Sequence, residues 1–203
     1  VASLQSADGA VVDAILDGLT TGIPGDFTVR TTEAFDAVLV ILLQKGSSGT
    51  KSRLVRLATQ CGTSALDAHA EEIVGSLLNT VSDVKGGDDV RVAAARDVVG
   101  FRADDRDVAQ QIVDQLNAQI APSLGLRFLQ TLRLSKSPAA GEIIVEKLPG
   151  LTPGLKSAAI GTLLSRPEWV RALLAGIETH AVELSDLSLD QKQALRSFPD
   201  RQL

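Results

Sequence analysis

The stretch GGDDVRVAAARDVVGF, residues 86–101, carries the pattern that decides the fold. Two glycines interrupt the chain, two aspartates follow, and apolar residues then recur every three or four positions. Side chains at this spacing share one face of an α-helix. We therefore expect a helix here, with Asp88 and Asp89 capping its start and interacting favourably with its dipole.

The same helical spacing of apolar residues continues through almost the whole chain. VLVILL at 38–43 could form a strand, but it lies in a longer helical window. Thr152-Pro153 and Ser137-Pro138 each place a capping hydroxyl before a first-turn proline, and Ser188 with Gln191 forms a capping box. The sequence predicts an all-α protein of about ten or eleven helices, roughly 8–16 residues long.

A cation recurs in the first turns of several predicted helices. Arg53, Arg91, Arg127 and Lys156 follow one another at separations of 38, 36 and 29 residues. Helix pairs have about this length, and self-similarity at periods of roughly 20–50 residues indicates a solenoid. The stem of each cation can cover apolar surface while its head stays wet or bonds an acidic neighbour. We expect stacked helix pairs that bury one another's apolar stripes; the alternative is a non-repeating bundle.

Composition argues against several classes of protein. The chain has 203 residues, of which 44% are hydrophobic and 22% charged, as in ordinary globular proteins. Aromatic residues make up only 3%, which favours close packing of helices over an aromatic-rich β-sandwich. The net charge is −5, and without a cluster of Lys and Arg we expect no nucleic-acid partner. No apolar run reaches about 18 residues, so we expect no membrane span.

Few residues could carry chemistry, and each has a structural interpretation. Cys61, the single cysteine, cannot form an internal disulfide, and its place on an apolar face predicts a buried, inert thiol. His69 in DAHAEE is expected on a solvated helix face, because one His with flexible neighbours does not make a metal site. His180 is expected to cap the end of its helix. Trp169 is expected to be a packing anchor; the alternative is an exposed binding hot spot.

Acidic and glycine-containing segments predict no ligand site. Asp88-Asp89, and Asp104-Asp105 with Asp107, could hold Ca²⁺ only with a loop glycine in a pattern that the sequence lacks, so we expect capping and solvation. GIPG at 22–25 is expected to be a turn, and no P-loop, Rossmann or G-x-S-x-G motif occurs. We therefore predict no catalytic, cofactor-binding or metal-binding residues and no cofactor.

DDVRVAAARDVVGF, residues 88–101, resembles the second helix of a HEAT repeat. That family's pattern has an acidic turn, then Val-Arg, then alanines and an aliphatic residue, which Asp89, Val90, Arg91, Ala93, Ala94 and Val98 match. The resemblance implies an α-α superhelix, that is, a HEAT/armadillo-like right-handed solenoid of helix pairs. It also implies a scaffold or binding role and not catalysis.

Residues 152–200 resemble the helical region of large multidomain proteins of planctomycete-type bacteria, which are similar to membrane-bound dehydrogenases. The resemblance rests on LLSRPEW at 163–169, then on Ala172-Leu173-Leu174, Ile177-Glu178, residues 184–187, Gln193 with Leu195, and Phe198-Pro199-Asp200. In that family a β-propeller precedes the helices and a haem-binding CxxCH module follows them. This chain has no CxxCH, since Cys61 stands alone in TQCGTSA. Haem is therefore expected only on a domain outside this chain.

The resemblance leads to an expectation about function. We expect residues 1–203 to form a single helical domain, a fragment of a longer multidomain chain, because it begins at Val1 and contains no Met. Its expected role is that of a non-catalytic scaffold or spacer that positions neighbouring domains or binds a protein partner. By resemblance the location is extracytoplasmic, of periplasmic type. The alternative is a free-standing HEAT-type protein-binding adaptor, and a helical enzyme is a third hypothesis.

Overall fold

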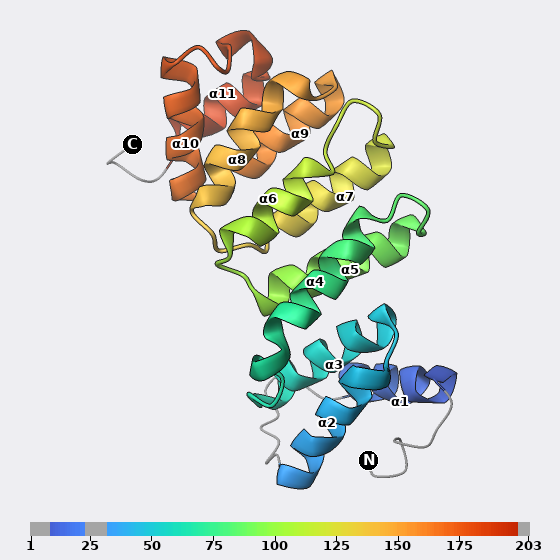
Figure 1. The fold of residues 1–203 in the computed structure, drawn as a ribbon. Helices are drawn as coiled ribbons and strands as arrows, with labels where there is room; N and C mark the ends of the chain where they lie inside the picture. The colour runs from blue at the N-terminus through green and yellow to red at the C-terminus, as the bar shows by residue number, and fades with distance from the viewer. Residues whose placement is uncertain (1–8, 23–31, 199–203) are drawn as a thin grey trace. The chain divides into compact units, whose positions relative to one another are not determined.

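The computed structural model describes residues 9–22 and 32–198, and every regular element within these ranges is a helix (Figure 1). Eleven α-helices and three short 3-10 helices follow one another along the described part of the chain. The all-α prediction is confirmed, and VLVILL lies inside a helix. Contacts divide the chain into two compact units, Val1–Phe101 and Arg102–Leu203. The expectation of a single domain stays a prediction.

The first unit packs its helices around α3. This helix contacts α1, α2, α4 and α5, and α4 also packs along α5. Leu43, Leu54, Ile73 and Val98 lie fully buried between these helices, as apolar stripes at helical spacing require. The elements are α1 (Gly9–Gly22), α2 (Glu33–Lys45), α3 (Ser48–Cys61), η2 (Asp67–His69), α4 (Ala70–Ser82) and α5 (Asp88–Phe101).

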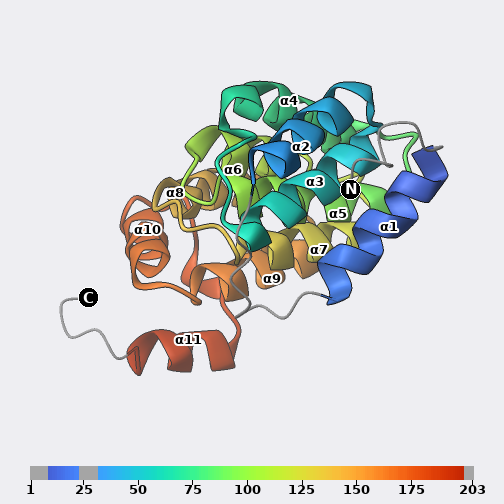
Figure 2. The same cartoon turned by 90° about the horizontal axis from the view of Figure 1, so that it is seen from below.

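The second unit arranges its helices in two layers (Figure 2). The contacts run from α6 to α8 to α10 in one layer and from α7 to α9 in the other. Gln191 of α11 donates to the Ser157 carbonyl at 2.8 Å, which places α11 beside α9. The elements are α6 (Arg106–Asp114), α7 (Pro122–Leu132), α8 (Ala139–Lys147), η3 (Leu148–Gly150), α9 (Pro153–Leu163), α10 (Pro167–Glu178), η4 (Leu184–Asp186) and α11 (Leu189–Arg196).

The four cations of the predicted repeat lie on alternate helices, α3, α5, α7 and α9. Arg53 pairs with Asp17 at 2.8 Å and Lys156 pairs with Asp186 at 3.2 Å, so these two heads bond acidic neighbours as expected. Arg91 is buried, and its Nε donates to the Val81 carbonyl near the end of α4 at 2.8 Å. The Arg91 guanidinium therefore bonds a backbone carbonyl, an interaction that the periodicity alone does not predict.

Capping follows the sequence in part. Ser188 and Gln191 form the predicted capping box in both directions. Thr152 stands at the N-cap of α9 but makes no side-chain cap bond. Near Ser137 the helix starts later than expected, with Pro138 at the N-cap of α8. Asp88 and Asp89 lie in the first turn of α5, where they favour the dipole, and not before the helix.

Candidate functional site

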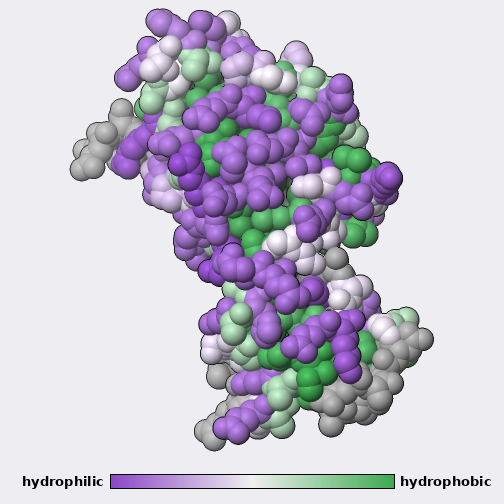
Figure 3. All heavy atoms as spheres, in the orientation of Figure 1, coloured by the Kyte–Doolittle hydropathy of each residue, from purple (hydrophilic) through white to green (hydrophobic). Residues whose placement is uncertain are grey.

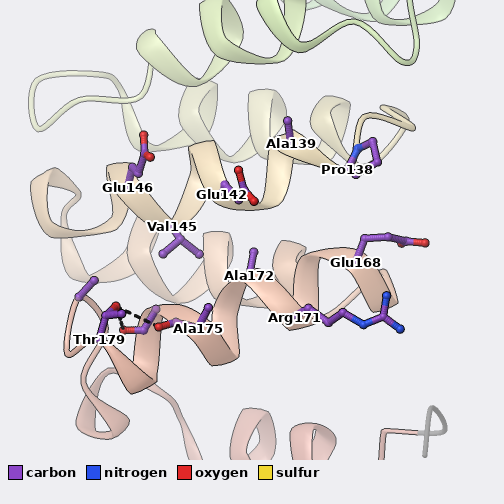
Figure 4. Close-up of a pocket in the computed structure, with 12 residues that line it drawn as sticks. Pro138, Ala139, Glu142, Val145, Glu146, Glu168, Arg171, Ala172, Ala175 and Thr179 are labelled. Carbon is purple, nitrogen blue, oxygen red and sulfur yellow. Dashed lines mark hydrogen bonds between the residues drawn. The ribbon is translucent and has the colours of Figure 1, made fainter. Parts of the chain in front are cut away.

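The candidate site is a groove of about 740 Å³ between α8 and α10, within the second unit (Figure 4). Its floor is apolar and small: Val145 reaches from α8 toward Ala172 and Ala175 on α10 (Figure 4). Val145 is 7% exposed, whereas Ala175 is exposed. A groove with an apolar floor can bury the side chains of a ligand, which is the main source of affinity in such sites.

Two glycines set the distance between the helices that form the groove. A Cβ atom on Gly141 of α8 would lie 2.9 Å from the Cα of Trp169, and one on Gly176 of α10 would lie 2.7 Å from Val145 Cγ1. Real Cβ atoms do not approach so closely, so the two helices pack together only because these positions lack side chains. The groove is what remains above this contact.

Trp169 anchors α10 beneath the groove. The side chain is 1% exposed, and its Nε1 donates to the Ser137 carbonyl at 3.0 Å, just before α8. The guanidinium of Arg166 lies 5.3 Å from the ring centre, within the range of a cation–π contact. The predicted packing anchor is confirmed, and the alternative of an exposed hot spot is wrong.

The rim of the groove is acidic. Glu142 and Glu146 line it from α8, and Glu168 and Arg171 line it from α10. All four side chains belong to exposed residues, and three carboxylates against one guanidinium leave a formal charge of −2. The face of this unit that Figure 3 shows is a mixture of hydrophilic and small apolar areas. The rim can therefore attract cationic groups, while the floor takes apolar ones.

Thr179 is the hydroxyl residue that lines this groove. Its Oγ1 donates to the carbonyls of Ala175 and Gly176 at 2.9 and 3.3 Å (Figure 4). The hydroxyl is thus engaged with the end of its own helix. The chemistry that the groove offers is apolar contact and ion pairing.

A second polar cluster lies on α1, α3 and α5 in the first unit, beside a pocket of about 180 Å³. Asp97 of α5 is nearly buried; it accepts from Arg56 Nη2 at 2.9 Å and from the Ser52 hydroxyl. Burial raises the pKa of Asp97, and the bond from Arg56 offsets only part of that effect. The cluster is a polar contact between α3 and α5.

The neighbouring cation has the opposite effect on its partner. Arg53 donates to Asp17 at 2.8 Å and lies 3.7 Å from Asp13, so it ties α3 to α1. The hydrogen bond from Arg53 lowers the pKa of Asp17. Thr50 also donates to Asp13 at 2.8 Å. These polar groups have structural partners on a neighbouring helix, which favours a packing role for the cluster.

The residues singled out from the sequence do not converge. Cys61 is buried, as predicted, and burial raises the pKa of its thiol, which keeps it protonated and inert. His69 belongs to the first unit, partly exposed, with Nδ1 3.8 Å from Glu72 Oε2. His180 belongs to the second unit and is exposed with a φ of 59°. The sequence predicts His180 as the cap of this helix, but the C-cap residue is Thr179. The backbone N–H of Thr179 bonds the carbonyls of Ala175 and Ile177.

The acidic segments behave as helix starts. Asp105 is the N-cap of α6 and accepts from the backbone N–H groups of Asp107 and Val108. Within the described ranges, no group of three or more His, Cys, Asp or Glu side chains could hold a metal ion. The predicted turn at 22–25 lies outside the described residues apart from Gly22, which ends α1.

Comparisons with known proteins add no assignment: no protein-family model, no curated protein and no solved structure matches the chain. No helix in the described part of the chain is long and apolar enough to cross a membrane.

The groove is not evident as a site from the sequence, although all of its lining residues are visible there. Glu142 and Glu146, four positions apart on one helix, are a local signal of an acidic face. The matching residues on α10 could not be paired with them, because that requires knowing which helices are neighbours.

Proposed function

We propose that the chain is a non-catalytic helical-repeat scaffold of the HEAT type, a right-handed solenoid that holds neighbouring domains or a partner protein in position. The support is a recurrence in the second unit. Ser135 bonds Ala103, Arg166 bonds Arg133, Trp169 bonds Ser137 and Gln191 bonds Ser157, at separations of 32, 33, 32 and 34 residues. Contacts that repeat at the length of one helix pair favour stacked units over an irregular bundle.

The first unit supports the same proposal with a longer spacing. Arg53 bonds Asp17 across 36 residues, Thr50 bonds Asp13 across 37, and Arg56 bonds Asp97 across 41. These bonds join α3 to α1 and to α5, the helices one pair away on either side. Their separations exceed those of the second unit, and the spacing of the four cations also decreases along the chain.

The parent that we propose is an extracytoplasmic, dehydrogenase-like protein that carries its haem on another domain. The support is the resemblance of residues 152–200 to that family. Exposed apolar side chains could contact neighbouring domains. Val11 and Ile15 on α1 are 49% and 41% exposed, Leu184 on η4 is 56% exposed and Leu189 on α11 is 79% exposed; Val84, Val90, Leu126 and Leu134 between them are exposed as well.

A distance measurement tests the scaffold. In a Cys61→Ala background, Asn79→Cys on α4 and Glu178→Cys on α10 place one spin label on an exposed site of each unit. Double electron–electron resonance should give a single narrow distance distribution, because a scaffold holds its parts at fixed separation. The matched pair Gln111→Cys with Glu178→Cys, both in the second unit, supplies the width expected of packed helices. A much broader distribution for the first pair would rule out a rigid spacer.

The adaptor is the second candidate, and the groove between α8 and α10 favours it. A free-standing adaptor needs a surface with both apolar and charged side chains, and this groove has both. The two roles differ in what the chain does alone: the adaptor binds its partner as an isolated domain, whereas the spacer requires its flanking domains.

A further inference from the structure

We propose that the groove between α8 and α10 binds a short, basic amphipathic helix of a partner protein; this inference rests on the proposed scaffold function and names the partner's chemistry. The helix places small apolar side chains on the floor formed by Val145, Ala172 and Ala175. Its Lys or Arg side chains face Glu142, Glu146 and Glu168 on the rim.

The size of the groove fits such a helix. α8 has nine residues and α10 has twelve, so at 1.5 Å per residue they extend about 14 and 18 Å. A ligand helix of about three turns matches this length. Helix-in-groove recognition uses small apolar anchors on one face, at helical spacing, against a floor of this kind.

The acidic side chains on α8 favour a cationic ligand in the groove. Glu142 and Glu146 are four residues apart on α8, a spacing at which like charges are unfavourable. Glu146 also lies in the last turn of α8, where the helix dipole disfavours an anion. No ion pair involves Glu142, Glu146 or Glu168 among the residues that the structure describes, and Lys147 pairs instead with Asp114 of α6 at 3.7 Å. A bound Lys or Arg would relieve both unfavourable placements.

The floor and the rim contribute differently to binding because they differ in exposure. The carboxylates belong to exposed residues, and exposed ion pairs contribute little affinity each but do select the sign and register of the partner. The apolar floor supplies most of the affinity, since the burial of apolar area releases more free energy than an exposed ion pair does. An acidic or purely polar helix therefore should not bind.

The test uses the full chain and three fluorescein-labelled 14-residue peptides in fluorescence anisotropy titrations. The first carries Leu and Ala on one helical face and Lys on the other; the second replaces every Lys by Glu; the third scrambles the first. We expect the first peptide to bind at least tenfold tighter than the other two, with an affinity that falls as salt is raised. Equal binding of the first and second peptides, or no binding of the first, overturns the proposal.

Variants locate the binding. Glu142→Gln with Glu146→Gln should weaken the first peptide at least fivefold and reduce its salt dependence. Ala175→Leu, at an exposed position on the floor, should weaken it by filling the groove without disturbing the core. The control Glu33→Gln with Asp190→Asn makes the same change in net charge at exposed sites outside the groove. If the control weakens binding as much as the groove variants, the peptide binds by general charge attraction and the proposal is wrong.

The distance measurement tests the rigid scaffold, and the peptide titrations test the proposed partner, so either can fail without the other. A broad distance distribution between the two labelled units removes the rigid scaffold but leaves peptide binding at the groove as the activity of an adaptor. A narrow distribution with no selective peptide binding leaves the scaffold and removes this partner.

Discussion

His180 occupies a backbone conformation that favours glycine. Its φ is 59°, directly after the end of α10, and Val182 N–H bonds the Gly176 carbonyl across it at 3.0 Å. This left-handed turn after a helix is usually made by Gly, because a Cβ there is strained. The strained turn leads the chain to Val182, whose side chain is buried.

Replacing His180 by Gly should therefore stabilise the protein. We expect His180→Gly to raise the free energy of unfolding by about 1 kcal/mol, because it removes the left-handed strain at an exposed position, and the greater freedom of glycine in the unfolded chain offsets part of the gain. Urea denaturation measures the change. The control Glu178→Gly, at the last residue of α10, should lower the same quantity by up to about 1 kcal/mol. A loss of stability in both variants would mean that contacts of the His180 side chain stabilise the fold by more than its strained backbone destabilises it.

Asp97 makes the stability of the first unit depend on pH. Burial raises the pKa of its carboxyl in the folded state above the ordinary value of about 3.9. Between these two values the folded protein binds the proton more strongly than the unfolded chain, so the contribution of Asp97 to stability falls as pH rises through this window. Above the folded pKa the contribution is constant.

Asp97→Asn should remove this dependence. Urea denaturation of both proteins from pH 3.5 to 7 should show the wild type losing stability relative to Asp97→Asn as pH rises. Asp17→Asn is the matched comparison with the opposite sign. Arg53 lowers the pKa of Asp17, so the wild type should lose stability relative to Asp17→Asn as pH falls. The same sign in both comparisons would contradict the opposite environments of the two carboxylates.

At the scale of single helices, the closeness of α8 and α10 depends on a missing side chain. A Cβ on Gly141 would lie 2.9 Å from both the Cα and a ring carbon of Trp169, which is fixed by its own hydrogen bond to Ser137. Gly161 on α9 differs, because a Cβ there would meet only the end of Gln191 at 3.8 Å. Two glycines inside helices of one unit thus have opposite surroundings.

Substitution by alanine should give opposite results at these positions. Gly141→Ala should lower the free energy of unfolding by about 1–3 kcal/mol through overpacking. Gly161→Ala should raise it by about 0.5–1 kcal/mol, since alanine restricts the unfolded chain and favours the helix. Thermal unfolding followed by circular dichroism compares the two. Equal effects would mean that α8 and α10 can separate without cost.

The sequence predicts where the helices lie along the chain better than it predicts which helices pack together. Apolar spacing identifies the helices, and Ser188 with Gln191 marks a helix start where the structure has it. The periodicity also places Cys61 and Trp169 in the core, because each falls on an apolar face. The close approach at Gly141 and the groove above it could not be predicted, since both depend on two helices that are separated by a third in the chain.

At the scale of the whole molecule, each unit contains one natural reporter. Cys61, the single cysteine, is buried in the first unit, and Trp169, the single tryptophan, is buried in the second. The reaction of a thiol reagent with Cys61 reports exposure of the first unit, and the fluorescence of Trp169 reports unfolding of the second. The unmodified sequence therefore allows the two to be followed in one sample.

A substitution in the second unit should affect the Trp169 signal more than the reactivity of Cys61. In urea, Gly141→Ala should shift the Trp169 transition to lower concentration by more than it shifts the Cys61 transition, because the added Cβ meets Trp169 directly and Cys61 lies in the other unit. The wild type, measured in the same way, is the reference for both transitions. Equal shifts would show that the chain unfolds as one cooperative body.

The recurring bonds of the second unit also bear on how such a chain can change in length. Ser135 and Lys136 both donate to the Ala103 carbonyl, at 3.0 and 2.8 Å, so the segment after α7 returns to the segment before α6. One helix pair later, Trp169 in the first turn of α10 donates to the Ser137 carbonyl before α8. Bonds thus span both helix pairs, α6–α7 and α8–α9, at nearly the same separation. Under the proposed repeat architecture, gene duplication or deletion of one whole pair would preserve such bonds, so the length of the protein could evolve through the number of pairs.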